Sequence, residues 1–150
     1  MNQDELYMEE AYKEALKAYQ KDEVPIGCVI VYNDEIIVRS HNLRENNQCA
    51  TSHAEIVAIE KACKILHNWH LDDCILYVTL EPCLMCSGAI VNSRIKKVVY
   101  GSEDLRWAGL SNVVKDYDKK INHHPEVIGG VLEDKCTALL KQYFKSKREK

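Results

Sequence analysis

The chain has 150 residues, of which 46% are hydrophobic and 29% charged, and its formal net charge is -3. This length fits one domain with a single core over residues 1–150, and no apolar run approaches the ~20 residues that span a membrane. Residues 1–23 are acidic and amphipathic and lack the basic start and apolar middle of a secretion signal. We therefore expect a cytoplasmic protein with no membrane partner.

Hydrophobic spacing along the chain predicts strands that alternate with helices. Such alternation favours an α/β fold, a three-layer α/β/α sandwich around a central sheet of about five strands. The expected elements are a helix at 4–21, strands at 28–32 and 36–40 joined by a hairpin turn, a helix at 53–66, a buried strand at 74–80, a helix from about Cys83 to Asn92, a strand at 97–100, a short helix before about residue 120, a strand at 126–128 and a closing helix at 132–148.

The seven cysteines do not form the even set typical of a secreted disulfide framework. Only Cys83 and Cys86 have a spacing with chemical meaning. The other five stand singly, and we expect them to be reduced thiols that pack as small hydrophobes; they are Cys28, Cys49, Cys63, Cys74 and Cys136.

A zinc site is indicated by His53, Cys83 and Cys86, because catalytic zinc takes three N or S ligands and keeps one position open. Two cysteines three apart share one helix face, and the positive end of that helix favours their thiolates. Pro82 is expected at the first helical position, where its missing N–H costs nothing. Glu55 is interpreted as a non-ligand that acts as general acid and base beside an activated water molecule.

The cysteine pair has two other interpretations besides a catalytic zinc site. A CxxC motif alone is equally typical of a redox pair or of half a structural zinc site. A redox pair has no use for the HxE motif, and a structural site would require a fourth sulfur or imidazole. HxE followed by PCxxC is instead the combination found in zinc-dependent nucleobase deaminases.

Several segments carry a closer resemblance, namely "VPIGCVIV", "HNLRE", "HAEIVAIE", "LYVTLEPCLMCSGAIVNSRIKKVVYG", "INHHPEVIGGVL" and "ALLKQYF". In order and spacing they resemble the tRNA-specific adenosine deaminases, which convert wobble adenosine to inosine. This resemblance implies a cytidine deaminase-like fold with a mixed sheet, a homodimer, Zn2+ on the three ligands named above and Glu55 as proton shuttle. It also implies that Asn42 hydrogen-bonds the substrate and that the pocket walls are Val24, Pro25, Ile26 and the backbone at Ala54.

The chain departs from the family pattern in two places. Ser52 precedes the histidine in "CATSHAE", where bacterial members usually read "PTAHAE". The loop "EDLRWAGLSN" keeps Asp104 but has Arg106 in place of a lysine. Because this loop lies near the substrate in the family, we expect both changes to affect substrate choice more than chemistry. Trp107 would either stack on a flanking base or pack inside the protein.

Charge is unevenly distributed along the chain. Residues 1–23 carry seven acidic side chains against three lysines, whereas the last ten residues carry five basic side chains against one acidic. We expect Lys145, Lys147 and Arg148 to contact the phosphates of a tRNA anticodon loop. Alternatively, these cations form a solvated helix end, placed favourably at the negative end of the helix dipole.

Two rival functions stay open from the sequence. One is a deaminase of free nucleobases or nucleosides, such as cytosine or guanine, with the same zinc site. The chain ends in a basic segment, however, and not in the aromatic segment that closes over a small base in such enzymes. The other is an inactive zinc-binding subunit of a heterodimer, which would have no need of Glu55.

Overall fold

The computed structural model describes residues 1–148, which build a five-stranded sheet in the order β2-β1-β3-β4-β5. The β1 strand pairs antiparallel with both β2 and β3, whereas β3, β4 and β5 run parallel. The sheet is therefore mixed, as the resemblance implies. Its strands are β1 (Gly27–Tyr32), β2 (Glu35–His41), β3 (Cys74–Leu80), β4 (Lys97–Ser102) and β5 (Glu126–Ile128).

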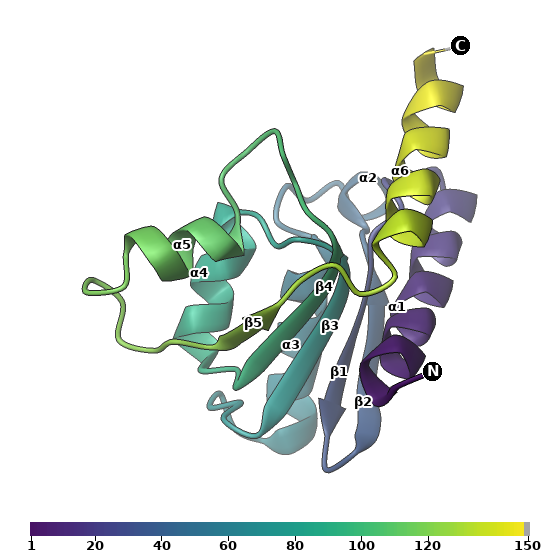
Figure 1. Ribbon diagram of the computed structural model, residues 1–150. Helices are drawn as coiled ribbons and strands as arrows, with labels where there is room; N and C mark the ends of the chain where they lie inside the picture. Colours follow the sequence, from purple (N-terminus) through teal and green to yellow (C-terminus); the bar gives the residue numbers. More distant parts are fainter. Residues whose placement is uncertain (149–150) are drawn as a thin grey trace.

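Helices cover both faces of this sheet (Figure 1). The α1 helix packs across β1, β2, β3 and β4, and α6 packs beside it on β3 and β4. On the other face α3 packs on β1 and β2 and contacts α4, which in turn contacts α5. This arrangement confirms the predicted three-layer sandwich. The helices are α1 (Gln3–Gln20), α2 (Arg44–Asn47), α3 (Ala54–Leu66), α4 (Leu84–Ser93), α5 (Leu110–Asp116) and α6 (Glu133–Arg148).

The central strand β1 shows how one sheet supports two cores. Successive side chains of a strand point to opposite faces, so Val29 and Val31 pack with Met8 of α1, whereas Cys28 and Ile30 pack with the α3 side. All four of these β1 side chains are buried. Because β1 is apolar on both faces, it packs against both helix layers and is buried between them.

The short helix α2 is absent from the sequence prediction. Its first turn is held by Glu23, which is buried and accepts hydrogen bonds from the backbone N–H groups of Glu45 at 3.0 Å and Asn46 at 2.6 Å. A carboxylate at a helix N-terminus satisfies donors that have no partner within the helix. The helix thus depends on a residue more than twenty positions away, and local pattern does not reveal it.

The cysteine prediction also meets one exception. All seven thiols are free among residues 1–148, and Cys28, Cys74 and Cys136 are buried. Cys49 is exposed instead of packed, because it lies in the loop between α2 and α3. No helix in residues 1–148 has the length and apolar character needed to cross a membrane.

Candidate active site

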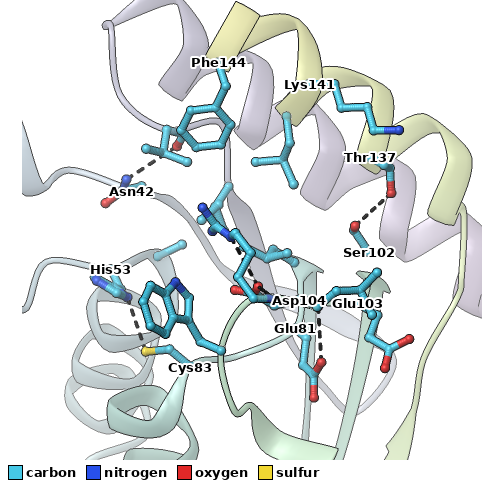
Figure 2. A pocket seen from close by; sticks show the side chains of 18 of the residues that line it. Asn42, His53, Glu81, Cys83, Ser102, Glu103, Asp104, Thr137, Lys141 and Phe144 are labelled. Atoms are coloured by element: carbon cyan, nitrogen blue, oxygen red, sulfur yellow. Dashed lines mark hydrogen bonds and ion pairs between the residues drawn. The ribbon is translucent and has the colours of Figure 1, made fainter.

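The three predicted zinc ligands meet where α3 and α4 begin. The His53 Nδ1 atom lies 3.7 Å from the Cys83 Sγ atom and 3.6 Å from the Cys86 Sγ atom, and the three ligand atoms all lie within 4.8 Å of one another. His53 and Cys83 are the N-cap residues of α3 and α4, yet neither side chain makes a capping hydrogen bond. Both are therefore free to face a common ion (Figure 2).

The placement of Pro82 differs from the prediction. The α4 helix begins at Leu84 with Cys83 as its extended N-cap, so Pro82 precedes the cap instead of occupying the first helical position. Its carbonyl oxygen accepts a hydrogen bond from the Leu110 N–H at 3.0 Å. Pro82 thus joins the ligand segment to α5, and the Cys83 side chain extends from the helix end instead of lying on its flank.

The donor set fits Zn2+ by its chemistry. The hydrogen bond with Cys86 lowers the pKa of Cys83 to about 4, and the same contact raises the pKa of Cys86 well above its usual value. The lowered pKa of Cys83 favours a thiolate, the form in which cysteine binds a metal ion, and metal binding releases the protons that remain on such ligands. Two sulfurs and one imidazole nitrogen are a catalytic zinc set when the fourth position stays open.

Glu55 lies in the first turn of α3 and lines the same cavity as His53. Its side chain is buried, and this burial raises the pKa of the carboxyl group to about 7. The cluster of three ligand atoms consists of His53, Cys83 and Cys86 and does not contain Glu55. The position is suitable for a group that exchanges protons with a substrate near neutral pH.

A cavity of about 950 Å³ opens over this site and extends to α6. Its size lies at the upper end of the range for small-molecule pockets, roughly 300–1,000 Å³, so a nucleoside would leave part of it free. Figure 2 shows Asn42, His53, Cys83 and Phe144 around it. Of the predicted pocket residues, the cavity is lined by Val24, Ile26, Asn42, Ala54, Asp104 and Arg106.

Neither Pro25 nor Ser52 lines the cavity that residues 1–148 form. Pro25 is buried and does not contribute to the cavity wall formed by residues 1–148. Ser52 is also buried, and its hydroxyl accepts a hydrogen bond from the Asn47 side-chain amide at 3.3 Å. Its contact is thus with the end of α2, so any effect on the substrate would pass through that loop.

Asn42 is buried at the cavity wall, and its amide already has protein partners. The Nδ2 atom donates to the Val24 carbonyl at 3.5 Å, and the Oδ1 atom accepts from the Arg44 N–H at 3.3 Å. Both distances exceed the usual 2.7–3.2 Å. The amide is thereby oriented without being fully engaged, which leaves hydrogen-bonding capacity for a ligand.

The segment from Glu103 to Ala108, called the pocket loop below, contributes part of the cavity wall. Within it, Asp104 accepts hydrogen bonds from the backbone N–H and the Nε atom of Arg106 at 3.0 and 3.4 Å. The Arg106 guanidinium lies 5.8 Å from the ring centre of Phe144 on α6. Trp107 is 71% exposed while lining the cavity, so the interpretation that it packs inside the protein is wrong.

The three basic residues of α6 that were predicted to contact tRNA fall into two groups. Lys145 and Arg148 line the cavity. Lys147 instead forms an ion pair with Asp22 at 2.5 Å and lies 5.5 Å from the ring centre of Tyr143. The last two residues of the basic segment, Glu149 and Lys150, lie outside the described residues.

Sequence reasoning missed several wall residues of the cavity, among them two apolar side chains of α6 and one carboxylate. Leu140 and Phe144 of α6 both line it, and their spacing of four residues on an amphipathic helix is a signal that could have found them. Glu81 also lines it while being 3% exposed. A carboxylate directly after an apolar strand and before a proline was its signal.

Fold and site together define a zinc-dependent deaminase, and the comparisons agree. Residues 1–102 match the family model of the cytidine and deoxycytidylate deaminase zinc-binding region, so the chain belongs to this family of hydrolytic enzymes. A tRNA-specific adenosine deaminase of Bacillus subtilis is 51% identical over all of this chain and 94% of its own length. One from Rickettsia typhi is 42% identical over 94% of this chain and 97% of its own. The resemblance inferred from the sequence is confirmed.

Solved structures of deaminases are also similar to this chain. A structure from a study of A-to-I editing by tRNA:A34 deaminases at the wobble position of transfer RNA has a TM-score of 0.84 and 38% identity, covering 89% of this chain and 98% of its own. A guanine deaminase from Bacillus subtilis has a TM-score of 0.64 and 42% identity over 69% of this chain and 66% of its own. The fold prediction is therefore confirmed, and both the family and the His-Cys-Cys set fit Zn2+ as cofactor.

Proposed function

We propose that this protein hydrolytically deaminates adenosine to inosine at the wobble position of tRNA, with residues 1–150 acting as one deaminase domain in the cytoplasm, where tRNA is found. One observation carries the proposal furthest. The cavity runs without interruption from the His-Cys-Cys site to Lys145 and Arg148 of α6. A single base would fill only the inner part, and phosphates of a longer substrate would meet the cations.

The reaction consumes one water molecule and releases one ammonia. When zinc is held by His53, Cys83 and Cys86, it supplies a water molecule able to attack carbon 6 of adenine near neutral pH. Glu55 takes one proton of that water and delivers it to N1 of the base. It then takes the second proton, from the hydroxyl now bonded to carbon 6, and passes it to the amine, which leaves as ammonia while the carbonyl of inosine forms. Asn42 and Ala54 hold the nucleoside at the cavity wall, and the buried position of Glu55 excludes bulk water from the proton transfer.

Delivery of the base requires that it leave its stack. An anticodon loop presents unpaired bases that can be splayed out at low cost. The exposed ring of Trp107 beside the cavity offers a stacking surface for a neighbouring base, a contact worth roughly 1–3 kcal/mol where it occurs. Arg106 supplies a charge to the adjacent phosphate.

The experiment that tests this proposal measures ammonia release by the zinc-loaded protein from several substrates. The panel holds an anticodon stem-loop with wobble adenosine, the same stem-loop with wobble guanosine, and free adenosine, adenine, cytosine and guanine. We expect release from the first stem-loop alone. Turnover of a free base with no reaction on RNA would reassign the protein to nucleobase salvage.

A free-base deaminase is the second candidate, and one observation supports it. The guanine deaminase named above shares 42% identity over 69% of this chain. Against it stands the open connection of the cavity to α6, because an enzyme for a small base would close over its substrate and exclude water. The substrate panel separates the two candidates directly.

The basic residues of α6 predict how salt affects binding. Each phosphate contact contributes a slope of roughly 0.7–0.9 to the fall of log K with log salt concentration. We expect replacement of Lys145 and Arg148 by alanine to reduce the slope for stem-loop binding by about one unit per residue. Lys147→Ala serves as the matched comparison and should change the slope less, since Lys147 is paired with Asp22. An unchanged slope in the double variant would remove α6 from the binding surface.

The homodimer is likewise a proposal. At the start of α4, Leu84 and Met85 are 55% and 37% exposed, directly beside Cys83. Burial of these apolar side chains against a second copy would place the partner at the rim of the site. We expect the protein to sediment as a dimer and Leu84→Glu to sediment as a monomer. Leu6→Glu, an equally exposed leucine on α1, is the control. An active monomer of the unsubstituted chain would contradict the proposal.

A further inference from the structure

Glu81 stands out among the cavity residues because its carboxylate is buried and accepts hydrogen bonds at both oxygens. The side chain is 3% exposed. Its Oε1 atom accepts a hydrogen bond from the Asp104 N–H at 3.3 Å. Its Oε2 atom accepts from both the N–H and the hydroxyl of Ser111, at 2.9 and 2.5 Å. One carboxylate thus holds the pocket loop at one oxygen, as Figure 2 shows for Glu81 and Asp104, and the start of α5 at the other.

The same carboxylate lies at the junction with the zinc-ligand segment. Glu81 is separated from Cys83 only by Pro82, and Cys83 pairs with Gly109 in a single antiparallel bridge. Gly109 packs so closely that a Cβ atom there would lie 2.7 Å from the carboxyl carbon of Glu81. The segment that carries Cys83, the Glu81 carboxylate and Gly109, which directly follows the pocket loop, are therefore packed in close contact.

This close packing is important because the pocket loop is otherwise exposed to solvent. Leu105 and Trp107 are 86% and 71% exposed, so little burial holds the loop in place. Its polar residues Asp104 and Arg106 nevertheless line the cavity. Glu81 links this exposed loop, and the start of α5 that follows it, to the strand that leads to the metal ligands.

We propose that Glu81 is a positioning residue, which fixes the pocket loop relative to Cys83 and thereby sets the distance between the substrate contacts and the reacting carbon. The inference deepens the proposed function and rests on it for its kinetic consequence. Its structural part, the anchoring of the loop, is independent of the substrate.

Glutamine at position 81 tests the idea with almost no change in volume. A carboxylate accepts hydrogen bonds at both oxygens, whereas a carboxamide has one acceptor and one donor group. With three donors arranged around Glu81, the amide NH₂ must face a backbone N–H in either orientation. At least one buried donor then loses its partner, which is costly in a site shielded from water.

The kinetic test compares Glu81→Gln with Glu60→Gln, an exposed carboxylate on α3. For deamination of the anticodon stem-loop, we expect Glu81→Gln to raise KM about tenfold, with a smaller effect on kcat and an unchanged zinc content. Glu60→Gln should match the unsubstituted protein. An unchanged KM together with a lowered melting temperature would show a purely structural role and overturn the proposal.

A second readout does not depend on activity. The chain has two tryptophans, so Trp69→Phe leaves Trp107 of the pocket loop as the single tryptophan reporter. In this background, Glu81→Gln should lower the fluorescence anisotropy of Trp107, since a released loop reorients faster. Unchanged anisotropy would overturn the anchoring. If the unsubstituted protein deaminates no RNA, the proposed function fails while this measurement still decides the role of Glu81.

Ser111→Ala covers the case in which Glu81→Gln does not fold. It deletes only the hydroxyl donor and keeps the charged acceptor, so KM and anisotropy should move in the same directions by smaller amounts. Where Glu81→Gln folds, the effects of the two substitutions on KM and anisotropy should be less than additive in the double variant. Both substitutions weaken the same contact, between Glu81 and Ser111. Full additivity, or no effect of Ser111→Ala on either quantity, would contradict the proposal.

Discussion

Replacing Glu55 with alanine is expected to lower the rate of inosine formation by at least about 10²–10⁴-fold, the usual contribution of a positioned general acid and base. The zinc content should stay unchanged, because the metal cluster consists of His53, Cys83 and Cys86. Alanine removes a buried carboxyl group and leaves the ligand atoms in place. The measurement pairs single-turnover rates with metal analysis of the same samples.

Glu60→Ala is the matched control, since it deletes a carboxylate from the exposed side of the same helix. It should retain both zinc and activity. A loss of zinc in Glu55→Ala would identify Glu55 as a ligand. Full activity with zinc retained would remove it from the chemistry altogether.

The second large effect is expected when one of the three metal-binding side chains is removed. We expect Cys83→Ala to lose both bound zinc and deaminase activity, because two remaining ligands do not meet the three that a catalytic site needs. The thermal stabilisation that added zinc gives the unsubstituted protein should also disappear, since stabilisation by a ligand requires binding to the folded state. Metal analysis and thermal melts with and without zinc provide the two readouts.

Cys49→Ala controls for the loss of a thiol, as Cys49 is exposed in a loop and outside the metal cluster. It should bind zinc and respond to added zinc like the unsubstituted protein. A Cys83→Ala variant that keeps its zinc content and activity would show that the metal is held elsewhere.

The fold was largely predictable because its strands carry strong local signals. The segment at 74–80 is apolar on both faces and became β3 with the predicted bounds, and the hairpin at 28–40 became β1 and β2. The same holds for the ligand cluster, where HxE and PCxxC each mark a helix start. Local pattern suffices in these places because the backbone conformation is determined by neighbouring residues.

What the sequence did not reveal depends on contacts between distant segments. The α2 helix needs Glu23, and the pocket loop needs Glu81. The sequence alone does not indicate which backbone N–H groups will donate hydrogen bonds to a given carboxylate. Likewise, the burial of Trp107 was open until the fold placed its loop at the cavity rim, where the ring is 71% exposed.

The most direct test of the central claim is to locate inosine in a reacted anticodon stem-loop. The zinc-loaded protein is incubated with RNA that carries adenosine at the wobble position and elsewhere in the loop, and the product is digested and mapped by mass spectrometry. We predict inosine at the wobble position alone, with one ammonia released per inosine. Unreacted RNA, while free guanine or cytosine is deaminated by the same sample, would contradict the account.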